Sequence, residues 1–233
     1  MKRLDRVAFV SQARLGSKRF PGKMMRPFAG SNLVEILCEK VKRSSFIPLE
    51  QFYFSAYEDE LVAAVERCGV QVFRRSRRSA ESEGPIEEIL EWHELPFDFA
   101  VQVSACNPLL GVETIDAFAR AYVESDLDGL FGVIARRNYF WNADGELVTP
   151  WPGSNFMDTK AVGVTYEAAH CLYAGRLDRL RRGVWMAEAP FRKDAPALFP
   201  VPELEAFDID FEWQFRLAEA LYRQGLGTAA LAP

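Results

Sequence analysis

The sequence predicts an α/β fold: a mostly parallel twisted sheet with helices on both faces. Short apolar runs rich in β-branched and aromatic residues recur along the chain, as in buried strands. Between them, apolar residues repeat every three or four positions, the period of a helix that packs on a core. Strands that alternate with helices in this way form parallel sheets covered on both sides. With 233 residues, 49% of them hydrophobic, the chain is expected to form one domain over residues 1–233.

The expected strands are short, and turn-forming or polar residues separate them from the helices. The first is a continuous apolar run, and the later ones mix aromatic with β-branched residues. They occupy residues 7–10, 51–55, 70–73, 99–104, 129–135 and 162–166, with a late strand at 207–209. The expected helices show the helical repeat and cover residues 32–42, 58–68, 86–94, 113–124, 167–177 and 212–223. Residues 225–233 are expected to form a loose tail.

The alternation of strands and helices breaks after residue 136. The segment that follows contains Trp141, Trp151, two prolines and the turn-like sequence Ala143-Asp-Gly145, without a helical period. We interpret residues 136–165 as a hairpin excursion from the sheet, used to bind an acceptor substrate or a second subunit.

The net charge of −5 combines two unlike parts. Residues 1–50 carry eleven Lys and Arg against four Asp and Glu, a net of +7, so the other 183 residues carry −12. A basic segment on an acidic body favours an anionic small molecule as ligand over nucleic acid, which requires a broader basic face. Scattered solvated charge explains the composition about equally well.

The spacing of the cysteines and the length of the apolar runs indicate the cellular compartment in which the protein is expected. The four cysteines are widely spaced and form no C-x-x-C pair, so neither a zinc ribbon nor a disulfide framework is expected. No run of about 18 apolar residues is present, and the first apolar run is too short for a signal peptide. We expect a cytoplasmic protein that does not bind membranes.

The most informative segment runs from Gln12 to Lys23, directly after the first expected strand. Gly16 and Gly22 allow tight turns in which backbone N–H groups approach an anion. Positive charge, as a polyphosphate ligand requires, comes from Arg14, Lys18, Arg19 and Lys23. The segment matches neither G-x-x-x-x-G-K-[ST], because Met24 follows the lysine, nor G-x-G-x-x-G. The alternative is a basic solvated turn.

Two aspartates stand two positions apart near the end of the chain. In an extended segment, Asp208 and Asp210 project to the same side while Ile209 faces the core. Mg²⁺ is commonly held by one or two carboxylates, with water and substrate phosphate as the other ligands. The pair therefore indicates a magnesium site. The alternative is that Asp210 caps the final helix and Asp208 is a solvated strand end.

Together the two segments resemble the cytidylyltransferases that activate acidic sugars. Residues 7–23, continued by Arg26-Pro-Phe-Ala-Gly30, are similar to the opening signature of the CMP-sialic acid (acylneuraminate) and CMP-KDO synthetases and of spore-coat polysaccharide cytidylyltransferases. Asp208-Ile-Asp210 is similar to the metal motif near the end of the same family. The resemblance implies a nucleotide-diphospho-sugar transferase-like Rossmann-type sheet, CTP and Mg²⁺ as ligands, and a homodimer.

The resemblance also implies roles for individual residues. The nucleotide-binding positions would be Ala13, Arg14, Gly16, Ser17, Lys18, Lys23, Ser82 and Ser104. Lys160 lies in a segment similar to one that contacts the acidic sugar. Arg136 and Arg137 can bind a sugar carboxylate bidentately, although two surface arginines are an equal interpretation.

Three segments depart from the family pattern. Met24 replaces the asparagine of the sialic-acid members, and Cys106 stands where the KDO and spore-coat branches have an aspartate. Ser55–Asp59 only approximates the family's Ser-Thr-Asp. The loop and the middle segment thus point to different branches, and the acceptor sugar stays open.

The leading hypothesis is Mg²⁺-dependent transfer of CMP from CTP to a hydroxyl of an acidic sugar, with release of pyrophosphate. Arg14 and Lys23 would stabilise the triphosphate and the departing pyrophosphate, and Asp210 would hold the metal at the α-phosphate. These three residues are the catalytic candidates. The alternatives are a catalytically silent nucleotide- or sugar-binding subunit of the same fold and nucleotidyl transfer to a sugar phosphate.

Overall fold

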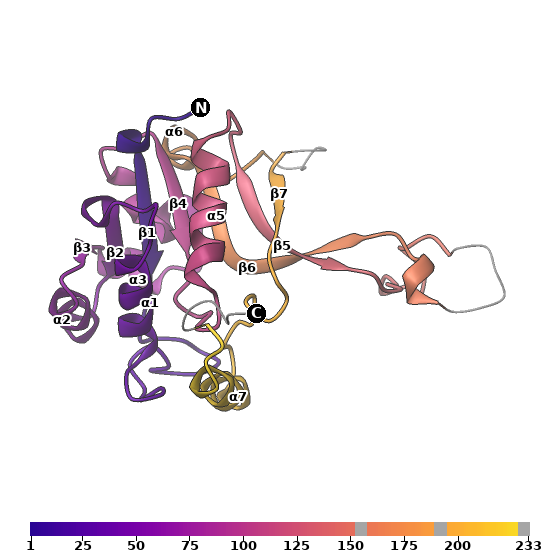
Figure 1. Cartoon of the computed structure of the whole chain (residues 1–233). Coiled ribbons are helices and arrows are strands. Elements are labelled where there is room, and N and C mark those ends of the chain that lie inside the picture. The colour runs from indigo at the N-terminus through magenta and orange to yellow at the C-terminus, as the bar shows by residue number, and fades with distance from the viewer. Residues whose placement is uncertain (152–157, 189–194, 228–233) are drawn as a thin grey trace.

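Seven strands of the described residues form one sheet, in the order β3-β2-β1-β4-β6-β5-β7 (Figure 1). The computed structural model describes residues 1–151, 158–188 and 195–227. The strands are β1 (Val7–Gln12), β2 (Phe52–Ala56), β3 (Gln71–Arg74), β4 (Phe99–Val103), β5 (Leu130–Arg136), β6 (Thr165–Arg176) and β7 (Ala197–Pro200). β6 runs antiparallel to its neighbours β4 and β5, and the other pairs are parallel. The predicted mostly parallel α/β sheet is confirmed.

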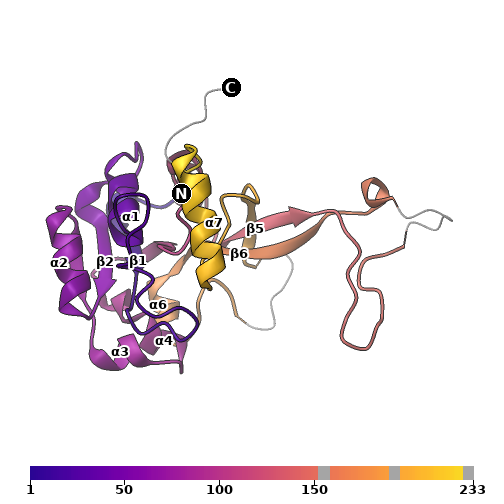
Figure 2. The ribbon, with the colours of Figure 1, turned by 90° about the horizontal axis from the view of Figure 1, so that it is seen from below.

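Helices lie on both faces of the sheet (Figure 2). They are α1 (Leu33–Lys42), α2 (Asp59–Arg67), α3 (Arg77–Glu81), α4 (Ile86–Ile89), α5 (Val112–Val123), α6 (Leu177–Leu180) and α7 (Glu212–Arg223). Side chains of strand β1 pack in two hydrophobic clusters, one on each face of the sheet, because alternate side chains of a strand face opposite sides. Val7 and Phe9 join a large cluster with α1, α2 and α5, and Ala8 and Val10 join a smaller one with α6. None of the helices in the described part of the chain is long and apolar enough to cross a membrane.

The strand order creates a switch point beside β1. The chain winds from β1 through β2 to β3 on one side, whereas β4 lies on the other side. In open sheets, a crevice forms at the carboxyl ends of the strands where the winding reverses, and ligands bind there. The segment that leaves β1 continues to Asn32, whose side chain accepts the N–H of Glu35 and so begins α1.

Two predicted elements near the end of the chain are wrong. Residues 167–177, predicted as a helix, belong mostly to β6, which pairs with β4 and β5. Their apolar spacing fits either period, and pairing on both sides decides for a strand. The strand predicted at 207–209 is irregular chain, held where the Ile209 N–H donates to the Cys106 carbonyl (3.1 Å). The edge strand β7 has no clear signal in the sequence.

Other boundaries differ in detail. Residues 86–94 form α4 and a separate 3₁₀ turn at Glu91–Glu94 rather than one helix. The strand predicted at 162–166 begins only at Thr165. Helix α3 lies in a segment for which neither a helix nor a strand is predicted. Residues 228–233 of the predicted tail lie outside the described residues.

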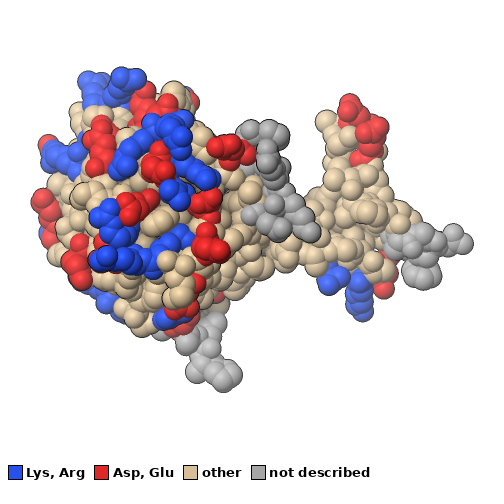
Figure 3. Space-filling view, turned by 90° about the horizontal axis from the view of Figure 1, so that it is seen from above, with Lys and Arg blue, Asp and Glu red and all other residues tan. Residues whose placement is uncertain are grey.

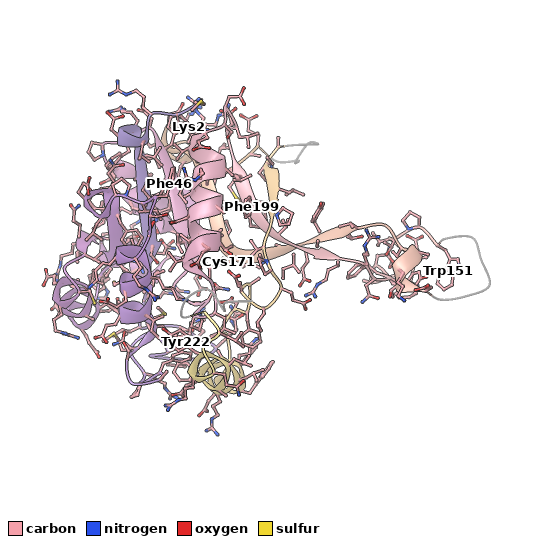
Figure 4. The ribbon with its side chains drawn as sticks, viewed as in Figure 1. Lys2, Phe46, Trp151, Cys171, Phe199 and Tyr222 are labelled. Carbon is pink, nitrogen blue, oxygen red and sulfur yellow. The ribbon has the colours of Figure 1, made fainter. Side chains whose placement is uncertain are left out.

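An arm projects from the sheet beyond the paired ends of β5 and β6 (Figures 1 and 2). Within it, Trp141 and Leu147 form an antiparallel bridge, and Tyr139 stacks on Trp151 with ring centroids 4.7 Å apart. Figure 3 shows charges of both signs interspersed on the body, whereas the arm is mostly uncharged on that face. Trp151 lies on the arm, away from the sheet (Figure 4). The chain therefore leaves the sheet where the sequence predicts an excursion.

Candidate active site

A cavity of about 440 Å³ lies at the crevice beside β1. Its wall contains six of the predicted site residues: Ala13, Arg14, Ser17, Lys23, Ser82 and Asp210. The other predicted nucleotide-binding residues, Gly16, Lys18 and Ser104, are not part of this wall. The Ser104 hydroxyl instead accepts the N–H of Cys106 (3.1 Å) just after β4.

The loop after β1 is closed by one peptide carbonyl. The carbonyl of Leu15 accepts the N–H groups of Ser17 (2.9 Å) and Gly22 (3.0 Å). Gly22 has a φ of +69°, a left-handed conformation that glycine adopts at little cost. The loop is therefore a hydrogen-bonded turn, and its residues Ala13, Arg14, Ser17, Arg19 and Lys23 line the cavity.

Glu83 pairs with two cations of this loop. Its carboxylate lies 2.7 Å from Nζ of Lys18 and 3.7 Å from Nη2 of Arg14. Arg14 also donates to the carbonyl of Ala80 (3.3 Å). Lys18 is held at the rim, where 76% of its side chain is exposed. An incoming polyphosphate would compete with Glu83 for both cations.

An ion pair between Lys23 and Asp210 connects the loop after β1 with the segment that precedes α7. Lys23 is buried, its ammonium group donates to the Ile209 carbonyl, and its Nζ lies 3.7 Å from Oδ1 of Asp210. Nη2 of Arg19 lies 2.7 Å from the same carboxylate oxygen. At the start of α7, the side chain of Gln214 accepts the N–H of Asp210 (2.7 Å). The Asp210 carboxylate thus faces the loop cations and does not cap the helix.

Asp208 and Asp210 are a donor set that fits Mg²⁺. Burial raises the pKa of Asp208, and the negative charge of Asp210 raises it further. A divalent cation bound by both carboxylates would offset these costs. In the described residues, no three or more His, Cys, Asp or Glu side chains are arranged to hold a metal. A metal here would take its remaining ligands from water and phosphate, as Mg²⁺ commonly does.

Met24 and Cys106, two departures from the family pattern, contact each other. Sγ of Cys106 lies 3.9 Å from Sδ of Met24, and both residues line the cavity. Burial raises the pKa of the Cys106 thiol, which is therefore protonated and neutral at pH 7. This position adds no negative charge to that of the two aspartates.

A second cavity, of about 420 Å³, shares Asp210 with the first. Its wall includes Arg136, Glu167, His170, Glu203 and Asp208. Arg136 donates to Glu167 (2.7 Å) and contacts Glu203, and these hydrogen bonds raise its pKa. His170 has a φ of +51° and lies where the pairing of β5 with β6 is interrupted by a bulge. The bulge places His170 in this wall, which a helical interpretation of the segment does not predict.

The other two predicted substrate-binding residues lie on the arm. Arg137 donates to the carbonyl of Val162 (3.0 Å). Lys160 is exposed in a 3₁₀ turn that begins after Asp158. Neither residue lines the two cavities described above.

Arg75 lines the site but was not predicted from the sequence. It follows β3 directly, is 4% exposed and lines the first cavity. Its Nη2 donates to the Ala13 carbonyl (2.6 Å), and its Nε is buried without a hydrogen-bond partner among the described residues. Burial lowers its pKa to about 10. The sequence feature that could have identified Arg75 is its position at the carboxyl end of a predicted parallel strand, where ligands commonly bind. The other arginines of the same run are exposed.

Comparison with known proteins identifies relatives over nearly the whole chain. Residues 8–178 match the family model described as cytidylyltransferase. The chain is 25% identical over 232 residues to the spore coat polysaccharide biosynthesis protein SpsF of Bacillus subtilis, covering 95% of this chain and 88% of that protein. It is 24% identical to the post-translational flagellin modification protein B of Campylobacter coli, covering 91% and 93%. A 3-deoxy-manno-octulosonate cytidylyltransferase of Francisella philomiragia is 28% identical over 119 residues, covering 51% and 46%.

Solved structures share the fold at lower identity. A CMP:2-keto-3-deoxy-manno-octonic acid synthetase complexed with CTP has a TM-score of 0.68 and 16% identity, with 95% of this chain and 100% of that chain covered. A 4-diphosphocytidyl-2C-methyl-D-erythritol synthase has a TM-score of 0.58 and 12% identity, with 93% and 98% covered. These neighbours confirm the nucleotide-diphospho-sugar transferase-like fold. Since the family model matches well over half of the sequence, from β1 into α6, the chain belongs to the cytidylyltransferase family.

Proposed function

We propose that this protein transfers CMP from CTP to a hydroxyl group of an acidic sugar and releases pyrophosphate. The observation that carries the proposal is the junction of the cationic loop with Asp210 in one cavity beside β1. Phosphoryl-type transfer depends mainly on positioning and on neutralisation of charge. The buried Lys23 and the loop residue Arg14 provide positive charge for the phosphates. The switch point of the sheet provides the crevice in which the substrates would be positioned.

The wall of the cavity after β3 suits a cytosine base. The Arg75 guanidinium can only donate hydrogen bonds, so it fits the O2 and N3 acceptors of cytosine, whereas N3 of uracil carries a hydrogen. The carbonyl of Ala80 can accept from the exocyclic amino group of cytosine but would oppose the O4 acceptor of uracil. Both groups favour CTP over UTP.

The loop cations would act on the triphosphate. Arg14 would exchange its distant contact with Glu83 for phosphate oxygens, and Lys23 would stabilise the charge that develops on the departing pyrophosphate. Lys18 would orient the outer phosphates from the rim. Mg²⁺ bound by Asp208 and Asp210 would supply Lewis-acid polarisation of the α-phosphate.

The second cavity would hold the acceptor, because Asp210 lines both cavities. The Francisella philomiragia relative is named for 3-deoxy-manno-octulosonate, an acidic sugar, which supports an acidic acceptor here. Arg136 would bind the sugar carboxylate in exchange for Glu167 or Glu203. Because Arg136 already pairs with two carboxylates, a second candidate is an acceptor without negative charge.

We also propose that the arm binds a second copy of this chain. Trp141 and Val148 are 54% and 63% exposed, although both are apolar. Contact with another subunit would remove these exposed apolar side chains from water. Analytical ultracentrifugation should give about twice the mass of 26.4 kDa, and Trp141→Ser should yield monomers. A monomeric wild-type protein at micromolar concentration would contradict the proposal.

The activity is tested by pyrophosphate release from each of the four nucleoside triphosphates with Mg²⁺ and a panel of acidic, phosphorylated and amino sugars. Turnover with CTP and an acidic sugar is expected. Turnover with CTP and only another class of sugar would keep the nucleotide and change the acceptor. Binding of CTP without turnover over the whole panel would instead support a catalytically silent subunit, against which the retained aspartate pair argues.

A further inference from the structure

We propose that Glu58 is a positioning residue of the nucleotide site, which holds the loop after β1 through the Leu15 N–H and places its negative charge near the buried Arg75. Glu58 is not part of the cavity wall. The inference rests on the proposed function, because the loop that Glu58 holds is the proposed triphosphate site.

The side chain of Glu58 accepts a hydrogen bond from a distant segment and does not cap the helix that follows it. Glu58 directly precedes α2, where an acidic side chain commonly accepts N–H groups of the first helical turn. It makes no such cap. Its Oε1 instead accepts the N–H of Leu15, 43 positions away, at 2.8 Å. Its Oε2 is buried without a hydrogen-bond partner in the described residues.

Arg75 holds the same stretch of the loop at its other end. Its Nη2 donates to the Ala13 carbonyl (2.6 Å). Burial lowers the pKa of Arg75 to about 10, and Glu58 is the main charge that acts in the opposite direction. The two side chains form no ion pair among the described residues, so this charge acts at longer range, and the direct contact of Glu58 with the loop is the one to Leu15.

The two contacts bracket Arg14. Arg75 fixes the peptide carbonyl before it, and Glu58 fixes the peptide N–H after it. The carbonyl of Leu15 then closes the rest of the loop. With this backbone held, Arg14 has a defined place in the cavity wall before CTP arrives. Without these backbone contacts, the loop would have to become ordered when CTP binds, and this loss of conformational entropy would lower the affinity for CTP.

Two substitutions separate the hydrogen bond from the charge. Glu58→Gln keeps an oxygen that can accept from Leu15 but has no charge to balance Arg75, whereas Glu58→Ala removes both. Asp59→Asn is the matched control, because Asp59 is the next residue, is exposed and pairs with Arg74. In calorimetric titrations without an acceptor, the Kd for CTP should rise about tenfold in Glu58→Gln and further in Glu58→Ala, the scale of one lost charge-assisted contact. It should stay unchanged in Asp59→Asn.

Amide hydrogen exchange gives a readout that does not depend on the nucleotide. The Leu15 N–H should exchange about tenfold faster in Glu58→Ala than in the wild type, while the amides of β1 keep their protection. In Glu58→Gln it should stay protected, because the acceptor oxygen remains.

The outcomes distinguish this inference from the proposed function. A wild-type Kd for CTP in both Glu58 variants, or faster exchange spread evenly over the chain, would overturn the positioning role and leave the proposed function standing. Should Glu58→Ala fail to fold, Glu58→Gln decides alone, since wild-type affinity there would overturn the role of the charge. Failure of the wild-type protein to bind CTP would overturn both.

Discussion

Replacing Asp210 with asparagine should leave the fold intact. Asparagine has nearly the same size and keeps an oxygen that can accept from Arg19. The Arg19 side chain is 61% exposed, so its ion pair contributes about 0–1 kcal/mol to stability, and the buried Lys23 ammonium keeps its hydrogen bond to the Ile209 carbonyl. Part of that loss is offset, because the Asp210 charge contributes to the raised pKa of Asp208 and its removal relieves the repulsion between the carboxylates. The free energy of unfolding should therefore change by less than about 1 kcal/mol.

Catalysis should respond to the same change far more strongly. Asp210 lines both cavities, so its charge lies where the α-phosphate and the acceptor would meet. Loss of one group that stabilises charge in a transition state lowers turnover by about 100- to 1,000-fold, or about 3–4 kcal/mol. We expect kcat of Asp210→Asn to fall within this range, with a higher requirement for Mg²⁺.

The assay is pyrophosphate release at saturating CTP, paired with urea unfolding of the same preparation. Glu212→Gln is the matched control, because Glu212 is a nearby carboxylate of α7 that is exposed, pairs with Arg216 and lies outside both cavities. Near-normal turnover of Asp210→Asn would refute the reasoning. An equal loss of activity in Glu212→Gln would show that charge near α7 matters in general and that Asp210 has no special role.

Two further predictions concern buried groups. Cys106→Asp should place a third carboxylate beside the aspartate pair and lower the Mg²⁺ concentration that gives half-maximal activity; an unchanged or higher concentration would contradict this. Lys40 is buried in α1, donates to the Pro108 and Leu110 carbonyls, and has a pKa that burial lowers to about 7. Between this pKa and the usual value of 10.5, the unfolded chain binds the proton more strongly. The free energy of unfolding should therefore rise with pH across that window, by a few kcal/mol on the order-of-magnitude scale of such shifts, and Lys40→Met should lack the rise in urea unfolding.

Local patterns predicted the parts of the site that lie within one segment. The loop after β1 and the Asp208/Asp210 pair were candidates from residue type and spacing, each beside a structural alternative, and the family resemblance supplied their roles. Although residues 207–209 are not a strand, the irregular chain there buries Ile209 and leaves both aspartates in a cavity wall. The alternation of buried and cavity-lining side chains that the spacing predicts is therefore present without a strand ladder.

Contacts between distant segments were not predictable in this way. The partners of Arg75 and Glu58 lie 62 and 43 positions away, and no periodicity connects them. Residues 165–176 satisfy both a helical and a strand pattern, so the pairing with β4 and β5 decides the structure. His170 was read as a helix residue near the site, whereas its place in the second cavity depends on the bulge in this strand.

The folded chain pairs the charges of its site before any ligand binds. Glu83 lies against Arg14 and Lys18, and Asp210 lies against Arg19 and Lys23, so each acid faces cations of the basic loop. A triphosphate that takes the cations from Asp210 leaves a carboxylate uncompensated, and a divalent cation that takes Asp210 leaves Arg19 and Lys23 without their partner. Each ligand alone thus creates an unpaired charge that the other would neutralise.

CTP and Mg²⁺ should therefore bind together more tightly than either binds alone. Calorimetric titration of CTP with and without Mg²⁺ measures this coupling, provided that the known affinity of Mg²⁺ for free CTP is subtracted. Arg19→Gln should reduce the coupling, because one of the two cations that compete for Asp210 is then neutral. An equal affinity for CTP in both conditions would mean that the ion pairs at Asp210 are not exchanged on binding, and the aspartate would then serve the loop and not the metal.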